Sequence, residues 1–375
     1  MRNRGLVHDL IDNSDVGDVL NNVLVGKFLT LNECIRLLRS EDIYAIGLVG
    51  NTLKRRLYGN NVTFVNNIIL NYTNVCVTYC KFCAFYRKPG DKESYTLPLE
   101  EIVRRVTTSR EMFGVTQVLI QGGHNPNLGI EYYENAFNAI KTKFPEIGIH
   151  GLSASEIDMI ARVERSSTKE VLARLKEAGL DSLPGAGAEI LDDEVKAEIS
   201  PLKIKSDEWL RIMEESHSLG LSSSATMMYG TVESEEQRAR HIMKIAHLQQ
   251  KTKGFMAFIP WSFEPNKTEI QDKGVIKYPS GGLNLLKMIA ISRIVFYGII
   301  DHLQSSWLTN GIGMAQLALN YGADDFGGTL IGEEVVSATG AASTQLTAQK
   351  IIDAVKQVGF DVSERDNFYR ILRKC

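Results

Sequence analysis

The feature that most constrains this chain is a regular alternation, from residue 66 onward, of short β-rich runs with longer segments of helical spacing. Strands are predicted at residues 67–72, 117–121, 148–152, 182–184, 223–227, 255–259, 301–305 and 324–327. Helices are predicted at residues 99–113, 130–143, 169–178, 207–219, 235–251, 283–297 and 313–321. Strands that alternate with helices of this length form βα units and a parallel sheet. The sequence therefore predicts an α/β fold.

The number of these units predicts the architecture. Several predicted helices end in a glycine followed by an apolar residue, as at Gly114 and Gly179, which is typical of a helix stop. About eight units fit a (β/α)8 TIM-type barrel, which needs about 250 residues, and a Rossmann sheet is the second alternative. Residues 1–65 have helical spacing, with Thr30 as a candidate N-cap. We expect an N-terminal helical extension at 1–65 and a barrel with C-terminal helices at 66–375.

Composition and charge narrow the class of protein. The net charge of −3 gives no cationic excess for nucleic acid or an anionic membrane. The N-terminus is interrupted by charges and lacks the apolar core of a secretory signal. The most apolar later stretch, residues 288–300, contains Arg293 and is too short to span a bilayer. We therefore expect a cytoplasmic protein with no nucleic-acid or membrane partner.

Three of the five cysteines, Cys76, Cys80 and Cys83, lie directly after the first predicted barrel strand. Barrel chemistry sits at this end of the strands, and closely spaced thiols in a reducing compartment favour metal binding. A four-iron cluster usually takes four cysteines, so three leave one iron open for a small molecule. Zinc with three cysteines and one histidine is the competing interpretation, although no nearby His or Cys completes such a site.

The pattern C-x3-C-x-aromatic-C, formed by Cys76, Cys80, Phe82 and Cys83, resembles the motif of the radical S-adenosylmethionine (radical SAM) superfamily. The resemblance implies a [4Fe–4S] cluster on the three cysteines, with S-adenosyl-L-methionine (SAM) bound at the open iron. It also implies an external one-electron donor, such as a flavodoxin or ferredoxin. The donated electron would cleave SAM into methionine and a 5′-deoxyadenosyl radical.

The same resemblance assigns cofactor contacts to several loops. The segment 121–123 resembles the family's glycine-rich segment, whose backbone meets the methionine amino group, and glycines allow such close approach. His124 stands where the family usually has an acidic residue. Glu189 is a candidate acceptor for ribose hydroxyls. The candidate cofactor contacts are Phe82, Gln121, Gly122, Gly123, Ser153 and Glu189.

Longer stretches resemble one branch of the superfamily, which acts in menaquinone biosynthesis through futalosine. They are NYTNVC, YCKFCAFYR, HGLSASE, DSLPGAGAEIL, MMYG and FIPWSFEPNKT. Tyr86 and Trp261 favour, within this branch, the conversion of dehypoxanthine futalosine into its cyclic product. The resemblance implies removal of the ribose C4′ hydrogen, addition of that carbon to the benzoate ring, and loss of one electron and one proton.

Four residues are candidates for catalysis. Arg87 is expected to pair with the benzoate carboxylate, and His124, His150 and Glu156 are candidate substrate contacts or bases. Trp261 is a candidate wall for the aromatic ring. The alternatives left open are aminofutalosine synthase or another radical enzyme of the same branch, and a zinc-binding structural protein with no radical chemistry.

Overall fold

The computed structural model describes residues 8–276, 279–341 and 344–375. Seven parallel strands form one curled sheet in the order β2-β3-β4-β5-β6-β7-β8, and four strands form a second sheet in the order β11-β10-β1-β9. The strands are β1 (Asn61–Val65), β2 (Asn67–Asn71), β3 (Gln117–Gln121), β4 (Gly148–Gly151), β5 (Ser182–Leu183), β6 (Ser222–Tyr229), β7 (Phe255–Ser262), β8 (His302–Leu303), β9 (Asp325–Gly328), β10 (Asp361–Arg365) and β11 (Ile371–Lys374).

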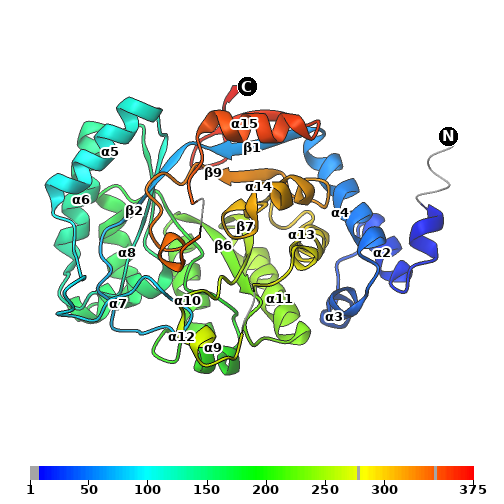
Figure 1. Cartoon of the computed structure of the whole chain (residues 1–375), viewed down its shortest axis with the longest axis horizontal. Coiled ribbons are helices and arrows are strands. Elements are labelled where there is room, and N and C mark those ends of the chain that lie inside the picture. Colours follow the sequence, from blue (N-terminus) through cyan, green and yellow to red (C-terminus); the bar gives the residue numbers. More distant parts are fainter. Residues whose placement is uncertain (1–7, 277–278, 342–343) are drawn as a thin grey trace.

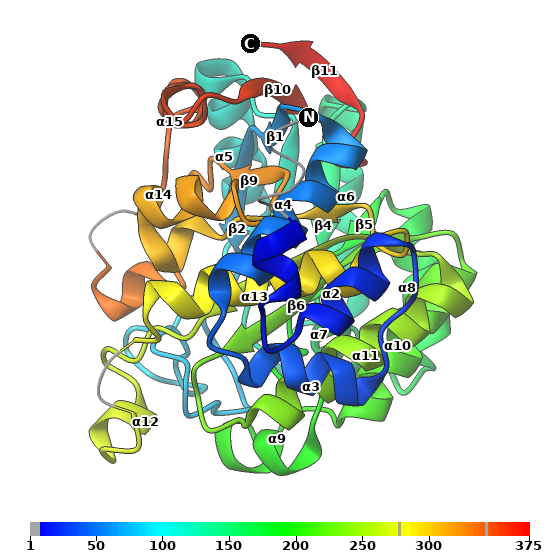
Figure 2. The same cartoon turned by 90° about the vertical axis from the view of Figure 1, so that its right-hand side faces the viewer.

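Helices surround the seven-stranded sheet on its outer face, and α2 to α4 lie at one side of the molecule (Figures 1 and 2). The helices are α2 (Gly17–Leu24), α3 (Leu31–Arg39), α4 (Ile43–Tyr58), α5 (Leu99–Phe113), α6 (Ile130–Lys143), α7 (Ala154–Glu164), α8 (Thr168–Glu177), α9 (Asp193–Ile199), α10 (Ser206–Ser218), α11 (Glu235–Thr252), α12 (Glu269–Asp272), α13 (Gly282–Phe296), α14 (Trp307–Ala318) and α15 (Ala348–Gln357), with a 3-10 turn, η1 (Ser337–Thr339). This parallel alternation confirms the predicted α/β barrel class.

The barrel differs from the prediction in how it closes. The predicted eighth strand, β9, belongs to the second sheet, where it pairs with β1. An isolated bridge between Gln304 and Asp325 joins it to the β8 side, and a bridge between Ile68 and Ile331 joins the following segment to β2. The hydrogen-bonded sheet is therefore seven-stranded, and β9 covers the gap between its two edges.

The two ends of the chain depart from the predicted helices. Thr30 caps α3 as predicted, because its hydroxyl accepts a hydrogen bond from the Glu33 amide. The predicted helical character of residues 61–65 is wrong, since Asn61–Val65 forms β1 and pairs with β10. Beyond α15 the chain forms an antiparallel pair, β10 with β11, and not a helix. The division into two parts at residue 65 stays a prediction.

None of the helices within the described ranges has both the length and the apolar character needed to cross a membrane.

Candidate functional site

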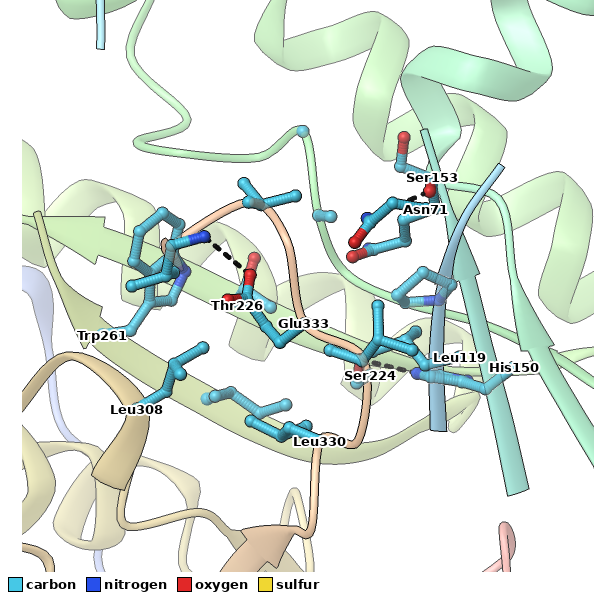
Figure 3. A pocket seen from close by; sticks show the side chains of 18 of the residues that line it. Asn71, Leu119, His150, Ser153, Ser224, Thr226, Trp261, Leu308, Leu330 and Glu333 are labelled. Carbon is cyan, nitrogen blue, oxygen red and sulfur yellow. Dashed lines mark hydrogen bonds between the residues drawn. The ribbon is translucent and has the colours of Figure 1, made fainter. Parts of the chain in front are cut away.

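A cavity of about 390 Å³ occupies the interior of the barrel. Its lining combines the cysteine loop after β2, the loop after β3 and the start of α7 with side chains from β6, β7 and the segment after β9. Figure 3 shows Asn71, Leu119, His150 and Ser153 along one wall, with Trp261 and Leu308 on the other. Residues that are distant in sequence therefore line one cavity.

All three cysteines of the predicted motif line this cavity. The Thr78 hydroxyl lies 3.0 Å from the sulfur of Cys76 and 3.8 Å from the sulfur of Cys80. Backbone hydrogen bonds fix the loop, including those from the Cys76 amide to the Arg87 carbonyl at 2.9 Å and from the Cys83 amide to the Cys80 carbonyl at 3.1 Å. The loop thus brings its sulfurs together at one side of the cavity.

The cysteine sulfurs suit a metal cluster. Burial raises the pKa of the Cys80 thiol to about 12 and also raises the pKa of Cys83. Such thiols become thiolates when a metal displaces the proton. Within the described ranges, no three His, Cys, Asp or Glu side chains converge on the position of a single metal ion. Thiolates that each bind a different iron of a cluster need not meet at one point, so the donor set fits a cluster.

The loop after β3 packs tightly against the cysteine loop. A Cβ atom on Gly123 would lie 2.2 Å from the Val75 carbonyl oxygen, and one on Gly122 would lie 2.8 Å from the Tyr72 ring. The Gly123 amide also donates a hydrogen bond to the Thr73 carbonyl at 2.8 Å. Only glycine permits this approach of two backbones. Gly122, Gly123 and Gln121 line the cavity, and their contact with methionine stays a prediction.

Glu156 ties three parts of the site together. One carboxylate oxygen accepts hydrogen bonds from the Gly122 amide and the Tyr72 hydroxyl, each at 2.9 Å. The other accepts from the amide and hydroxyl of Ser153, each at 2.7 Å. This capping box starts α7. Since four donors occupy its carboxylate, the arrangement favours a positioning role for Glu156, and its predicted role as a base stays untested.

Glu189 lies between two buried lysines. Its carboxylate oxygens lie 2.7 Å from Lys203 Nζ and 3.1 Å from Lys196 Nζ. Burial opposes ionisation, but the two ammonium groups outweigh it and lower the pKa of Glu189 to about 2. The Lys203 ammonium also lies 5.5 Å from the centre of the Phe82 ring. The group carries one surplus positive charge beside the cysteines, and a contact from Glu189 to ribose hydroxyls stays a prediction.

Both predicted site histidines line the cavity. Burial, assisted by the charge of Lys203, lowers the pKa of His124 to about 3. Burial, assisted by Arg365, likewise lowers the pKa of His150 to about 3. His150 Nδ1 lies 2.7 Å from the Ser182 hydroxyl. Both rings are therefore neutral at physiological pH, and the structure does not test their catalytic roles.

Arg87 is not among the described residues that line the cavity. Its guanidinium pairs with Glu93, at 2.7 Å, and donates to the carbonyl oxygens of Ala84 and Tyr86. These contacts hold the turn that follows the cysteines. The predicted contact with a substrate carboxylate therefore has no support in this arrangement.

Several cavity residues were missed by the sequence analysis. Lys203 follows α9, Glu333 follows β9, and Arg365 and Asn367 come from the end of β10 and the loop after it. One signal was available: β2 reads NIILN and β3 reads QVLIQ. In each of these strands the first, third and fifth residues face the same side, and the first and fifth are polar. Polar residues at these positions indicate that part of the barrel interior is polar. No local pattern marked Glu333 or Arg365.

Comparison with known proteins assigns the chain to a family. The model of the radical SAM superfamily matches residues 70–245, and the model of the CofH/MqnC C-terminal region matches residues 252–374. The cyclic dehypoxanthine futalosine synthase of Streptomyces coelicolor is 40% identical over 97% of this chain and 90% of its own length. The chain is a radical SAM enzyme of the CofH/MqnC family.

This family forms carbon–carbon bonds, and its members use a [4Fe–4S] cluster, SAM and a reductant. The 5-amino-6-(D-ribitylamino)uracil–L-tyrosine 4-hydroxyphenyl transferase of Methanocaldococcus jannaschii is nearly as similar, with 39% identity over 92% of this chain and 98% of its own. Cys76, Cys80 and Cys83 line the cavity, and their binding of the cluster stays a prediction.

Solved structures agree with the fold. Methylornithine synthase has a TM-score of 0.70, with 17% identity over 91% of this chain and 96% of its own. The hydrogenase maturase HydG has a TM-score of 0.74, with 17% identity over 96% of this chain and 78% of its own. At such identities these similarities establish the fold alone.

Proposed function

We propose that this enzyme converts dehypoxanthine futalosine into cyclic dehypoxanthine futalosine in menaquinone biosynthesis. The observation that carries the proposal is the similarity to two synthases of that name. The S. coelicolor protein is 40% identical over 97% of the chain, and that of Halalkalibacterium halodurans is 38% identical over 96%. The reductant would be a small one-electron donor such as a flavodoxin or ferredoxin.

The two walls of the cavity suit different parts of the reaction. The wall after β2 to β4 carries the cysteines, the glycine segment and Ser153. When bound there, the cluster and SAM supply a 5′-deoxyadenosyl radical. The opposite wall carries the apolar side chains Trp261, Leu308 and Leu330, which face the cavity (Figure 3). A sugar beside the first wall and an aromatic ring against the second would place the two reacting carbons between them.

The proposed reaction needs a proton acceptor. After the sugar C4′ loses its hydrogen atom and adds to the ring, the ring gives up one electron to a one-electron acceptor of the iron–sulfur class and one proton to a base. Of the carboxylates that line the described cavity, Glu156 has four hydrogen-bond donors and Glu189 has two lysines. Within the described residues Glu333 has no lysine or arginine partner, and it accepts its hydrogen bonds from backbone amides.

Glu333 is placed for this role. It lies after β9, is buried, and projects into the cavity near Thr226 (Figure 3). Its carboxylate accepts hydrogen bonds from the amides of Val336, at 2.6 Å, and Ser337, at 3.0 Å. Burial nevertheless raises its pKa above the usual value. A carboxylate with a raised pKa is a better proton acceptor. Burial raises the pKa of Glu156 as well, but four donors from three parts of the site occupy its carboxylate, so Glu333 is the base in this proposal.

Replacing Glu333 with glutamine is expected to separate radical formation from product formation. Glutamine keeps the size and one hydrogen-bond acceptor but cannot take up the proton. The ratio of cyclic product to 5′-deoxyadenosine should fall about 100-fold, the usual effect of removing a general base, while 5′-deoxyadenosine still forms. The cyclic product and 5′-deoxyadenosine are quantified in the same sample by mass spectrometry.

Glu334→Gln is the matched control, because Glu334 pairs with Tyr95 and Arg105 and is not among the described cavity residues. It should retain the wild-type product ratio. An unchanged ratio in Glu333→Gln, with the cluster intact, would exclude Glu333 as the base.

A second candidate function is the transfer of a 4-hydroxyphenyl group from L-tyrosine to 5-amino-6-(D-ribitylamino)uracil. The transferase of M. jannaschii, at 39% identity, favours it. The deciding experiment reconstitutes the protein anaerobically with iron and sulfide and supplies SAM and dithionite. Three substrates are then supplied in separate reactions. They are dehypoxanthine futalosine, L-tyrosine with 5-amino-6-(D-ribitylamino)uracil, and the substrate of aminofutalosine synthase.

Cyclic dehypoxanthine futalosine from the first reaction alone supports the proposal. A product only from tyrosine and the uracil, or only from the aminofutalosine synthase substrate, would replace it. Membership of the radical SAM family replaces the earlier zinc alternative. Iron and sulfide analysis of the same sample measures how fully the cluster is loaded, because a [4Fe–4S] cluster contains about four irons and four sulfides.

A further inference from the structure

The inward side chains of the barrel form layers of different polarity. Strands β2 and β3 are parallel and in register, and alternate residues of a strand face the same side. The cavity-lining pairs, from the start of the strands to their ends, are Asn67 with Gln117, Ile69 with Leu119, and Asn71 with Gln121. Four residues of strand span about 13 Å. The wall formed by β2 and β3 thus has a polar rim beside the cysteines, an apolar middle and a polar floor, and His150 of β4 is in register with Leu119 of the middle.

The segment after β10 builds this floor. The Asn367 amide oxygen accepts a hydrogen bond from Gln117 at 2.7 Å, and its nitrogen donates to the Ser182 hydroxyl at 2.9 Å. A Cβ on Gly148 would lie 2.5 Å from the Asn367 Cβ, so the segment packs directly under the start of β4. Hydrogen bonds between segments distant in sequence therefore form the floor, and residues of the C-terminal region close it.

Arg365 is the cation of this floor. It is 3% exposed and lines the cavity. Its Nε and Nη2 donate to the Asp325 carboxylate at 2.6 and 3.2 Å, and its Nη1 donates to the Asp366 carbonyl at 3.0 Å. A guanidinium has five N–H donors, so two remain beyond these three bonds. The Tyr369 ring, with its centre 3.7 Å from the guanidinium carbon, fixes the plane of the group.

The buried charges beneath the floor do not balance. Lys54, Arg293 and Arg365 face two carboxylates, Asp324 and Asp325, and each of these side chains is at most 3% exposed. Arg293 pairs with Asp324, and Arg365 with Asp325. Among the described residues the Lys54 ammonium has no hydrogen-bond partner, and it lies 4.0 Å from the Phe360 ring centre. Its pKa, lowered by burial to about 8, keeps it mainly protonated at pH 7. One positive charge is left over.

We propose that Arg365 binds the carboxylate of the substrate at the floor of the cavity, an inference that rests on the proposed function and names the contact for the benzoate group. A buried carboxylate needs both hydrogen bonds and a neutralising charge, and the floor offers both. The other lysine or arginine that lines the described cavity is Lys203, which lies beside the cysteines and Glu189.

The orientation follows from the layers. The sugar must lie at the rim, where the hydrogen atom is removed, so the far end of an extended substrate reaches the floor. The aromatic ring then lies in the apolar layer, and the negative charge of Glu333, on the segment after β9, disfavours a carboxylate at that level. In this proposal Arg365, and not Arg87, binds the benzoate carboxylate.

The test combines a change in the protein with a change in the ligand. Dissociation constants of dehypoxanthine futalosine and of its carboxamide analogue are measured by anaerobic calorimetry on the SAM-loaded holoenzyme. In the wild type the carboxamide should bind about 10- to 100-fold more weakly, as expected for a lost charged hydrogen bond. In Arg365→Lys, which keeps a cation for Asp325 but loses the planar fork, this difference should shrink to a few-fold.

Arg373→Lys is the matched control, because Arg373 is exposed, pairs with Glu364 and is not among the described cavity residues. It should keep the wild-type difference. An undiminished difference in a folded Arg365→Lys variant would overturn the assignment, as would a wild-type enzyme that binds acid and carboxamide equally.

A measurement on the wild type covers the case in which Arg365→Lys does not fold. Benzoate and benzamide differ only in the charged group. Benzoate should slow the hydrogen exchange of the backbone amides at residues 365–369, and benzamide should not. Equal protection would overturn the floor site. Failure of the proposed function is recognised separately, by the absence of cyclic product from the unmodified substrate.

Discussion

Replacing Cys80 with alanine is expected to abolish cluster assembly and 5′-deoxyadenosine formation while the barrel stays folded. Loss of an outer contact to a metal ligand already costs 10- to 100-fold in metal affinity, so loss of the ligand itself should cost more than about 100-fold. The fold should persist because Cys80 lies in the loop after β2 and not in a strand or helix of the barrel. Iron content, circular dichroism and SAM cleavage measure the three properties.

Cys34→Ala is the matched control for this experiment. Cys34 is also a buried thiol, on α3, but it is not among the residues that line the cavity in the described chain. Cys34→Ala also removes one buried sulfur atom but leaves the cysteine loop unchanged, so the variant should bind a full cluster. Full iron content in Cys80→Ala, or loss of helical signal in that variant, would contradict the expectation.

Replacing Gly123 with alanine is expected to weaken SAM binding about 10- to 100-fold. The added Cβ would lie 2.2 Å from the Val75 carbonyl oxygen and 2.7 Å from its carbon, and these are backbone atoms that cannot rotate away. Overpacking of this kind costs about 1–3 kcal/mol. The strain falls on the residue that precedes Cys76, so iron content should fall as well. Equilibrium dialysis with labelled SAM and iron analysis measure both effects.

Gly313→Ala is the control for the size of the substitution. Gly313 lies inside α14, and apart from its own helix backbone no atom of the described residues would lie within 4 Å of its added Cβ. Alanine favours a helix over glycine by up to about 1 kcal/mol, so the variant should be as stable as the wild type or more stable. Wild-type SAM affinity in Gly123→Ala would show that the two backbones can separate without loss of function.

Much of the fold could be predicted because its signals are local. The strand and helix patterns from residue 66 onward, and the Thr30 cap, depend on residues a few positions apart, and the structure confirms them. Pairing between strands is not local. The β1 strand was assigned to a helical extension because its partner, β10, lies about 300 residues later. The same long-range pairing removes β9 from the main sheet.

The site divides in the same way. The cysteine motif, the tight glycines and the Ser153 cap are encoded within short segments, and all of them line the cavity. Arg87 shows the limit of such reasoning. Its neighbour in sequence, Tyr86, lines the cavity, but the Arg87 guanidinium pairs with Glu93. Sequence position places a residue on a loop, whereas the direction of a long side chain depends on the partners that the fold provides.

By itself, the sequence determined the radical SAM motif and the alternation of strands and helices, because spacing along the chain fixes both. Only the tertiary structure decided what surrounds a substrate. Asn367 meets Gln117 across 250 positions, and Arg365 meets Asp325 across 40. Contacts of that range arise when the β10 segment closes the bottom of the barrel. Burial then leaves each polar group dependent on whichever partner lies beside it.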